Sequence, residues 1–367
     1  MKNILFFLFI ILIIFSLRSN KIYKEFFCNN DIYDIANTIN YNNLYKKYID
    51  LYFSDIIYKN QSNIYSSPNN KIFVSIASYR DPQCSITLID LIKKAEFPQN
   101  LIIVICQQND IDDDECSSFF KDKNIKTIRY NAKDARGPCW ARFLIQQEWN
   151  GEEYYLQIDS HTRFVDKWDT KCISNLKKAQ EKQNTDLICL SNYVSTFNIN
   201  TNEIEINPLR GPMYIEKFDE KDGFFRYNAK YINNLSEPQE SKGWSGCFSF
   251  SNYKIILDAP YDPYTPFLFF GEEMDIFARL YTKGWLMFVP AEPICFTLFD
   301  RSYRKLYWYH PDFFETVLLS KLRLYLRFGV YKDVNSLPDE IKKDLDLEKF
   351  SLGNKKTFDD FIKYCLE

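Results

Sequence analysis

Histidine is nearly absent from this 367-residue sequence, which contains only His161 and His310. A metal site built from several histidines is therefore excluded. None of the ten cysteines form a Cys-x-x-Cys pair, which argues against a zinc ribbon or a thioredoxin-type motif. Glycine (10) and proline (14) are too scarce for a collagen-like or linker-dominated chain. An excess of basic residues is also missing: the net charge is −3, so we expect no nucleic-acid partner.

The amino terminus carries one uncharged apolar run, ILFFLFIILIIFSL, at residues 4–17. A comfortable membrane span needs about 20 apolar residues, and a signal-peptide core is shorter. No small-x-small cleavage site follows the run, so we expect residues 1–18 to be an uncleaved signal anchor, with a cleaved signal peptide as the second choice. Residues 19–70 are rich in Asn, Tyr, Lys and Ile and are predicted to form a stem or accessory segment.

Signals for the side of the membrane conflict. Arg18, Lys21 and Lys24 follow the apolar run, which favours a cytoplasmic body. Glycosylation sequons at Asn60 and Asn234 favour a lumenal body. The scattered cysteines fit either a few lumenal disulfides or buried cytosolic thiols. We expect a single-pass membrane protein facing the ER or Golgi lumen, with a cytosolic body as the alternative.

The body of the chain alternates short apolar strands with helices. Such alternation indicates an α/β fold with a mostly parallel sheet covered on both faces, in which ligands bind beyond the carboxyl ends of the strands. Residues 195–240 are polar and predict an insertion or acceptor-side loop, and the charged tail at 331–367 predicts partial helix. The expected strands are 72–77, 101–106, 125–130, 154–158 and 187–190, and the expected helices 85–94, 138–149, 168–183 and 273–281.

Asp159-Ser160-His161 directly follows one of these strands. A carboxylate and an imidazole two positions apart at a strand end can point at one ion, and such ligands suit Mn²⁺ or Mg²⁺ bridging a diphosphate. Taken alone, the tripeptide is better explained by an aspartate that caps a turn.

Charged residues elsewhere add candidates. Arg136 precedes, and Arg142 lies on, the helix before that strand, where they could contact a diphosphate or position Asp159; the alternative is a surface ion pair. Glu272 and Glu273 begin a helix and could orient sugar and acceptor hydroxyls, or simply be favoured there by the helix dipole. The basic segment, residues 300–305, could close over a diphosphate or be a solvated loop.

Together these motifs resemble the GlcNAc-transferase family that includes the Skp1 polypeptide α-N-acetylglucosaminyltransferase and the protozoan mucin-type transferases. A more distant resemblance is to the polypeptide GalNAc-transferases, which share an Asp-Ser-His metal motif. The resemblance covers roughly residues 70–310. It is carried, in chain order, by Val74–Pro82 (VSIASYRDP), Gly137–Arg142 (GPCWAR), Tyr155–Phe164 (YLQIDSHTRF), Gly246–Ser251 (GCFSFS), Phe269–Glu273 (FFGEE) and Arg301–Arg304 (RSYR).

The resemblance implies a GT-A glycosyltransferase fold over residues 71–310, followed by a helical extension at 311–367. It implies a UDP-GlcNAc donor, Mn²⁺ or Mg²⁺, a polypeptide hydroxyl (Thr, Ser or hydroxyproline) as acceptor, and retention of anomeric configuration. Carried over by motif, the metal ligands are Asp159 and His161. On the donor side the candidates are Ser78, Arg80, Asp81, Arg136, Arg142, Arg301 and Arg304, and the candidate catalytic residues are Glu272 and Glu273.

One position departs from the family pattern. Members commonly have a His where this sequence has Thr297, and that His is a candidate third metal ligand. A hydroxyl is a weaker ligand than an imidazole. We therefore expect a metal-dependent transferase with lower metal affinity, in which Thr297 takes the third place unless Asp300 or water substitutes for it. Two alternatives remain: a transferase for another UDP-sugar, and a non-catalytic sugar-nucleotide or glycan-binding relative.

Overall fold

The computed structural model describes residues 47–48, 51–61, 63–64, 68–201, 209–219, 223–232, 235–329 and 349–367. The predicted anchor at 1–18, most of the predicted stem and the sequon residue Asn234 lie outside these ranges. Among the described residues, no helix has the length and apolar character needed to cross a membrane.

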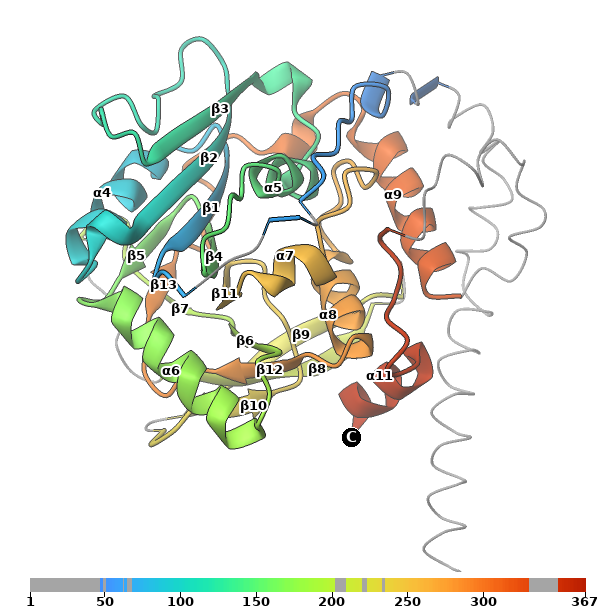
Figure 1. Cartoon of the computed structure of the whole chain (residues 1–367). Helices are drawn as coiled ribbons and strands as arrows, with labels where there is room; N and C mark the ends of the chain where they lie inside the picture. The colour runs from blue at the N-terminus through green and yellow to red at the C-terminus, as the bar shows by residue number, and fades with distance from the viewer. Residues whose placement is uncertain are drawn as a thin grey trace, which may run out of the picture.

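A mostly parallel sheet of eight strands forms the centre of the molecule, in the order β10-β12-β6-β11-β4-β1-β2-β3 (Figure 1). The strands β1 to β4 run parallel, β11 runs antiparallel between β4 and β6, and β10 lies antiparallel to β12 at the edge. The bounds are β1 Ile72–Tyr79, β2 Leu101–Asn109, β3 Ile125–Asn131, β4 Tyr154–Asp159, β6 Ile188–Ser191, β10 Gln239–Ser241, β11 Phe248–Asn252 and β12 Leu286–Val289.

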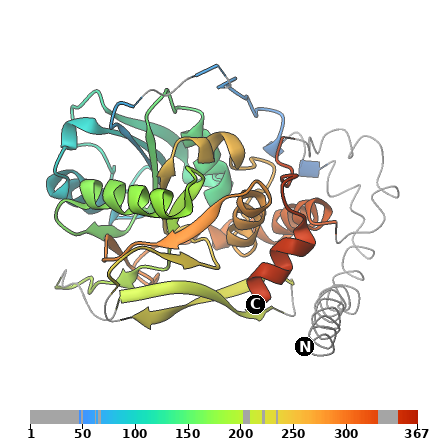
Figure 2. The same ribbon diagram turned by 60° about the horizontal axis from the view of Figure 1, so that its bottom comes forward.

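Helices cover both faces of this sheet, as the alternating pattern predicted (Figures 1 and 2). One core packs α4 (Cys84–Lys94) and α6 (Trp168–Gln183) on one face. The other core packs the remaining helices on the opposite face. Those helices are α5 Pro138–Gln146, α7 Lys254–Asp258, α8 Glu272–Thr282, α9 Phe313–Arg327 and α11 Phe358–Leu366. The last two confirm helix within the predicted C-terminal extension.

Two small sheets complete the fold. One has the order β5-β13-β7, with β5 Thr162–Phe164, β7 Ser195–Thr196 and β13 Cys295–Thr297. The other is the hairpin of β8 (Leu209–Phe218) and β9 (Phe225–Ile232). This hairpin corrects the expectation of a loop at 195–240. In β9 the alternate residues Phe225, Tyr227 and Ala229 are buried, because only one face of the strand joins the core.

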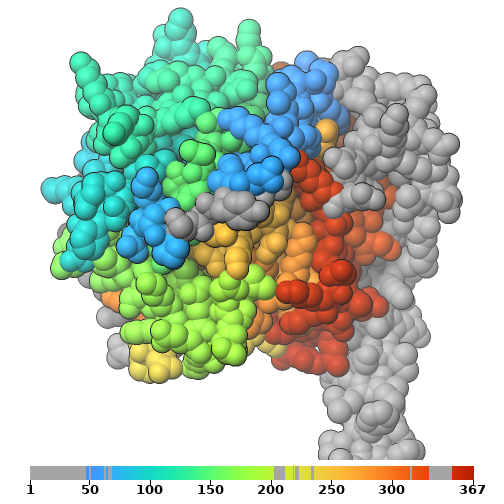
Figure 3. Space-filling model, in the orientation of Figure 1, coloured from blue at the N-terminus to red at the C-terminus, as the bar shows by residue number. Residues whose placement is uncertain are grey.

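The described part of the predicted stem packs on the domain, where Figure 3 shows it in blue against the surface. Tyr52 is 4% exposed, and its hydroxyl donates a 2.6 Å hydrogen bond to Asp312 at the start of α9. Asp55 forms an ion pair of 2.7 Å with Arg136, next to α5. The carboxyl-terminal end of the stem is therefore part of the folded unit.

Candidate active site

A cavity of about 730 Å³ opens at the carboxyl ends of the central strands. Ala77 and Tyr79 of β1, Gln108 of β2 and Asp159 of β4 contribute to its lining. Parallel strands bring their carboxyl ends to one edge of a sheet, and this is the edge where open α/β sheets bind ligands. The cavity therefore lies where the strand pattern predicted a site.

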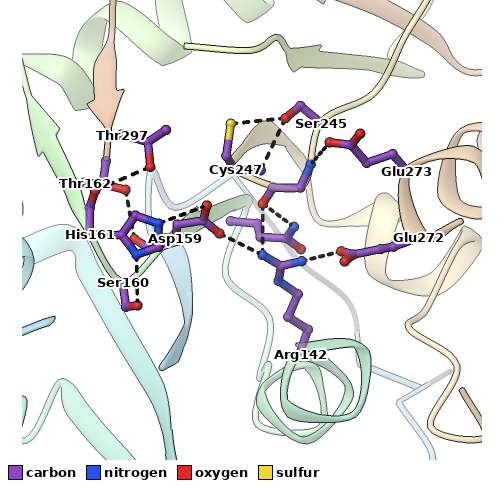
Figure 4. Close-up of polar contacts among 12 residues, drawn as sticks. Arg142, Asp159, Ser160, His161, Thr162, Ser245, Cys247, Glu272, Glu273 and Thr297 are labelled. Carbon is purple, nitrogen blue, oxygen red and sulfur yellow. Dashed lines mark hydrogen bonds and ion pairs between the residues drawn. The ribbon is translucent and has the colours of Figure 1, made fainter. Parts of the chain in front are cut away.

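Asp159 and His161 meet at this edge (Figure 4). Asp159 ends β4, and a tight connection to β5 places the His161 ring beside it, with Nε2 3.6 Å from Asp159 Oδ2. Both side chains line the cavity. The structure thus brings together the two residues predicted from the Asp-x-His motif.

Asp81 fixes the other side of the imidazole. Its carboxylate lies 2.8 Å from His161 Nδ1 and accepts a 2.7 Å hydrogen bond from the Ser160 hydroxyl. Burial alone would raise the pKa of Asp81, but the hydrogen bond and charge of His161, with the charge of Arg304, outweigh burial and lower it to about 2. An ionised carboxylate only accepts, so Nδ1 carries a hydrogen. In the neutral imidazole Nε2 then has the lone pair that a metal ion needs.

Arg142 links the carboxylates of Asp159 and Glu272 (Figure 4). Its guanidinium forms ion pairs with Glu272 and with Asp159, the latter at 3.1 Å, and donates 3.1 Å to the carbonyl of Gly246. Burial alone would lower the pKa of Arg142, but the charge of Glu272 in particular raises it well above its usual value. The structure shows the contact of Arg142 with Asp159, and Arg142 also lines the cavity, so its contact with a diphosphate stays a prediction.

Glu272 and Glu273 begin α8 but face different partners. Glu272 is 6% exposed and also accepts a 2.6 Å hydrogen bond from Tyr261. Glu273 lines the cavity, where it accepts hydrogen bonds from the Tyr193 hydroxyl at 2.5 Å and the Gly246 amide at 3.2 Å. Burial outweighs these hydrogen bonds and raises the pKa of Glu273 to about 7. Such a carboxyl can accept or hold a proton near neutral pH.

Arg301 and Arg304 of the basic segment also line the cavity. The Arg301 guanidinium carbon lies 4.8 Å from the ring centroid of Phe269 and 5.3 Å from that of Trp308. Nε of Arg304 lies 3.6 Å from Asp81 Oδ2. The segment therefore presents two cations to the cavity, as a site for a diphosphate requires.

Three other predicted donor-side residues are placed away from the lining. Ser78 is buried with 1% of its surface exposed. Arg80 forms ion pairs with Asp113 at 2.7 Å and Asp110 at 3.3 Å. Arg136 binds Asp55 and the backbone carbonyl of Tyr52, both at 2.7 Å. Each arginine is held by carboxylates from another segment, and the donor-side role of these three residues stays a prediction.

Thr297 is likewise absent from the cavity lining. It is 1% exposed, and its hydroxyl donates to the backbone carbonyl of His161 at 3.4 Å. The structure therefore places this hydroxyl against the backbone of His161, and a ligand role for Thr297 stays a prediction.

The donor set fits a divalent cation held partly by substrate. Asp159 and His161 offer oxygen and nitrogen of the kind that Mn²⁺ accepts. Within the described ranges, no group of three or more His, Cys, Asp or Glu side chains is arranged to hold an ion. Two protein ligands leave coordination positions for diphosphate oxygens and water, which is the usual situation at phosphate-transfer sites.

Sequence reasoning missed several lining residues. Tyr193 donates a hydrogen bond to Glu273, and Arg226 of β9 stacks on Phe270 with 4.1 Å from the guanidinium carbon to the ring centroid. The signal for β9 was the alternation of buried and polar residues in FRYNAKYI. Tyr193 had no comparable signal, because its contact depends on where β6 ends relative to α8.

Comparison with known proteins gives one family match. The model of the family described as "Glycosyltransferase (GlcNAc)" matches residues 71–120 and 117–366. No curated protein sequence matches the chain.

One solved structure shows the fold. A crystal structure of GalNAc-T7 with UDP, GalNAc and Mn²⁺ superposes with a TM-score of 0.59 at 16% identity, covering 81% of this chain and 57% of that chain. The chain thus spans little more than half the length of that protein. S. aureus TarS in complex with UDP-GlcNAc matches with a TM-score of 0.42 at 13% identity, covering 80% of this chain and 81% of that one. The central sheet and its helices are those of the GT-A glycosyltransferases.

Proposed function

The chain belongs to the glycosyltransferase family described as "Glycosyltransferase (GlcNAc)", and from this premise we propose that it transfers GlcNAc from UDP-GlcNAc to a hydroxyl group of a polypeptide. The observation that carries the proposal is the Asp159–His161 pair at the end of β4, facing a cavity that also contains Glu273 and Arg301. This arrangement combines a cation site, anion-binding side chains and a carboxyl whose pKa lies near neutrality.

Asp159 and His161 would hold Mn²⁺ or Mg²⁺, which when bound supplies Lewis-acid neutralisation of the leaving diphosphate. Arg142 keeps the Asp159 carboxylate in place, and Asp81 keeps the His161 ring in place. The cations of Arg301 and Arg304 lie where they can bind the negative charge of UDP. These residues together favour departure of UDP from the sugar.

Glu273 is the group we assign to the reacting hydroxyls. Its carboxyl is held by Tyr193 and the Gly246 amide, so its position in the cavity is defined before substrate binds. With a pKa of about 7 it can accept a hydrogen bond from an acceptor hydroxyl or share its proton. Glu272 also lines the cavity, but its carboxylate is paired with Arg142. We propose retention of anomeric configuration, in which the leaving phosphate takes the acceptor proton.

We also propose that the protein is membrane-anchored with its body in the ER or Golgi lumen. The apolar run at 4–17 supports an anchor. A disulfide between Cys84 and Cys116 supports an oxidising compartment, and the remaining described cysteines are buried thiols.

A donor screen tests the proposed activity. Release of UDP from UDP-GlcNAc, UDP-GalNAc and UDP-Gal is measured with Mn²⁺, Mg²⁺ or EDTA, with and without an acceptor peptide mixture. We expect the fastest release from UDP-GlcNAc, dependent on metal and accelerated by peptide. Faster release from another sugar would reassign the donor. Binding of UDP-GlcNAc without any release would identify a non-catalytic relative.

A further inference from the structure

Asp81 joins two parts of the site that are far apart in the sequence. One carboxylate contacts His161 at the end of β4 and also Tyr303 and Arg304 of the basic segment. We propose that Asp81 is a positioning residue through which the basic segment, when seated over the cavity, fixes the metal ligand His161. This inference rests on the proposed function, because it concerns the same metal site.

The His161 side of this link is tight. Asp81 Oδ2 lies 2.8 Å from Nδ1, so the ring is held with Nε2 toward Asp159, 3.6 Å away. The Ser160 hydroxyl donates to the same oxygen at 2.7 Å. Carboxylates that bind the far nitrogen of a metal-ligating histidine set its tautomer and orientation, and their loss weakens metal binding about 10–100-fold.

The basic segment reaches the same carboxylate from the other side. The Tyr303 hydroxyl donates to Oδ1 and Oδ2 of Asp81 at 3.2 and 3.3 Å, and the Arg304 Nε lies 3.6 Å from Oδ2. Asp81 is only 4% exposed, so these contacts are made away from bulk water. Arg304 and its neighbour Arg301 line the cavity. When Arg301 and Arg304 lie over a UDP-sugar, the same segment therefore also holds Asp81 in place.

Because both contacts use the Asp81 carboxylate, seating of the basic segment and metal binding at His161 depend on each other. If the Tyr303 contact holds Asp81 in the position that orients His161, seating the segment strengthens metal binding. By linkage, a bound metal then strengthens seating of the segment by the same factor. The pocket would hold the metal most firmly when the cations of the segment face the diphosphate.

Tyr303→Phe is the sharpest test, because it removes one hydroxyl and keeps the ring. Asp81→Asn changes more of the local structure, since Asp81 also accepts a 2.9 Å hydrogen bond from the backbone N–H of Gln83, just before α4. Tyr309→Phe is the matched control, because Tyr309 lies a few residues beyond the segment and is 81% exposed. Thermal unfolding of each variant monitors the fold.

The readout is the Mn²⁺ dissociation constant, obtained from the electron paramagnetic resonance signal of free Mn²⁺ with and without UDP. We expect Tyr303→Phe to weaken binding about fivefold or more, Asp81→Asn to weaken it about 10–100-fold, and Tyr309→Phe to change nothing. The Asp81→Asn/Tyr303→Phe double variant should bind as Asp81→Asn does, because Tyr303 acts through Asp81.

Two results would overturn the inference. If both single variants fold and bind Mn²⁺ within twofold of the wild type, Asp81 does not position the ligand, while the proposed function still stands. If Tyr303→Phe weakens binding equally with and without Asp81, the effect does not pass through that carboxylate. A wild-type protein that binds no Mn²⁺ even with UDP would instead overturn the proposed function itself.

Discussion

Replacement of Arg142 by Met should destabilise the fold more than removal of any solvent-exposed charged side chain. The Arg142 and Glu272 side chains are 5% and 7% exposed, so the variant leaves a buried carboxylate facing Tyr261 and Gly246 without its cation. Breaking a buried ion pair in this way costs about 3–5 kcal/mol, a large part of the total stability of about 5–15 kcal/mol of a typical protein.

Urea unfolding followed by fluorescence measures the effect. Lys59→Met is the control, because its ion pair with Glu148 has the lysine 54% exposed and should contribute less than about 1 kcal/mol. Adding Glu272→Gln to Arg142→Met should recover part of the loss, since the unpaired buried charge disappears. If Arg142→Met and Lys59→Met lose the same small amount, the buried pair is not the link we infer between Asp159 and α8.

Three further predictions address charge, space and compartment. The pKa of Glu273 is raised from its ordinary value of 4.5 to about 7 in the folded protein, so Glu273 ionises at lower pH in the unfolded chain. The free energy of unfolding should therefore fall between about pH 4.5 and 7. A Glu273→Gln variant should lose this pH dependence in urea titrations at several pH values. Gly246→Ala would place a methyl 3.1 Å from Arg142 Nη1 and 3.2 Å from Glu272 Oε1, so we expect a loss of about 1–3 kcal/mol and slower UDP release; wild-type values for both would show that the neighbours yield freely. In microsomes of cells that make the protein, the chain should resist carbonate extraction and contain a Cys84–Cys116 peptide in non-reducing mass spectrometry. Full protease sensitivity in sealed microsomes with both thiols free would place the body in the cytosol.

The strands and helices around the cavity could be predicted because burial on both faces leaves nearly continuous apolar runs in the strands. Residues 72–77 and 154–158 carry such runs, and the structure extends the first to Tyr79 and the second to Asp159. The β8–β9 hairpin was missed because it is buried on one face only. Its polar positions gave the segment the composition of a loop.

The metal motif could be located from the sequence because its two residues are neighbours in the chain. The partners of the surrounding charged residues could not be predicted from the sequence. Arg136 is bound by Asp55 and Arg80 by Asp113, pairs 81 and 33 residues apart. Asp81, a predicted donor-side residue, contacts His161, an arrangement that depends on the parallel pairing of β1 with β4.

The rate of metal-dependent UDP release by the Asp159→Ala variant, compared with the wild type, tests the central claim most directly. Asp159 ends β4 with its side chain 28% exposed, so the variant should keep the fold and unfold within a few degrees of the wild type. With Mn²⁺ and UDP-GlcNAc, we expect the wild type to release UDP only in the absence of EDTA, and Asp159→Ala to be at least about 100-fold slower. A folded Asp159→Ala protein that releases UDP at the wild-type rate would contradict the account.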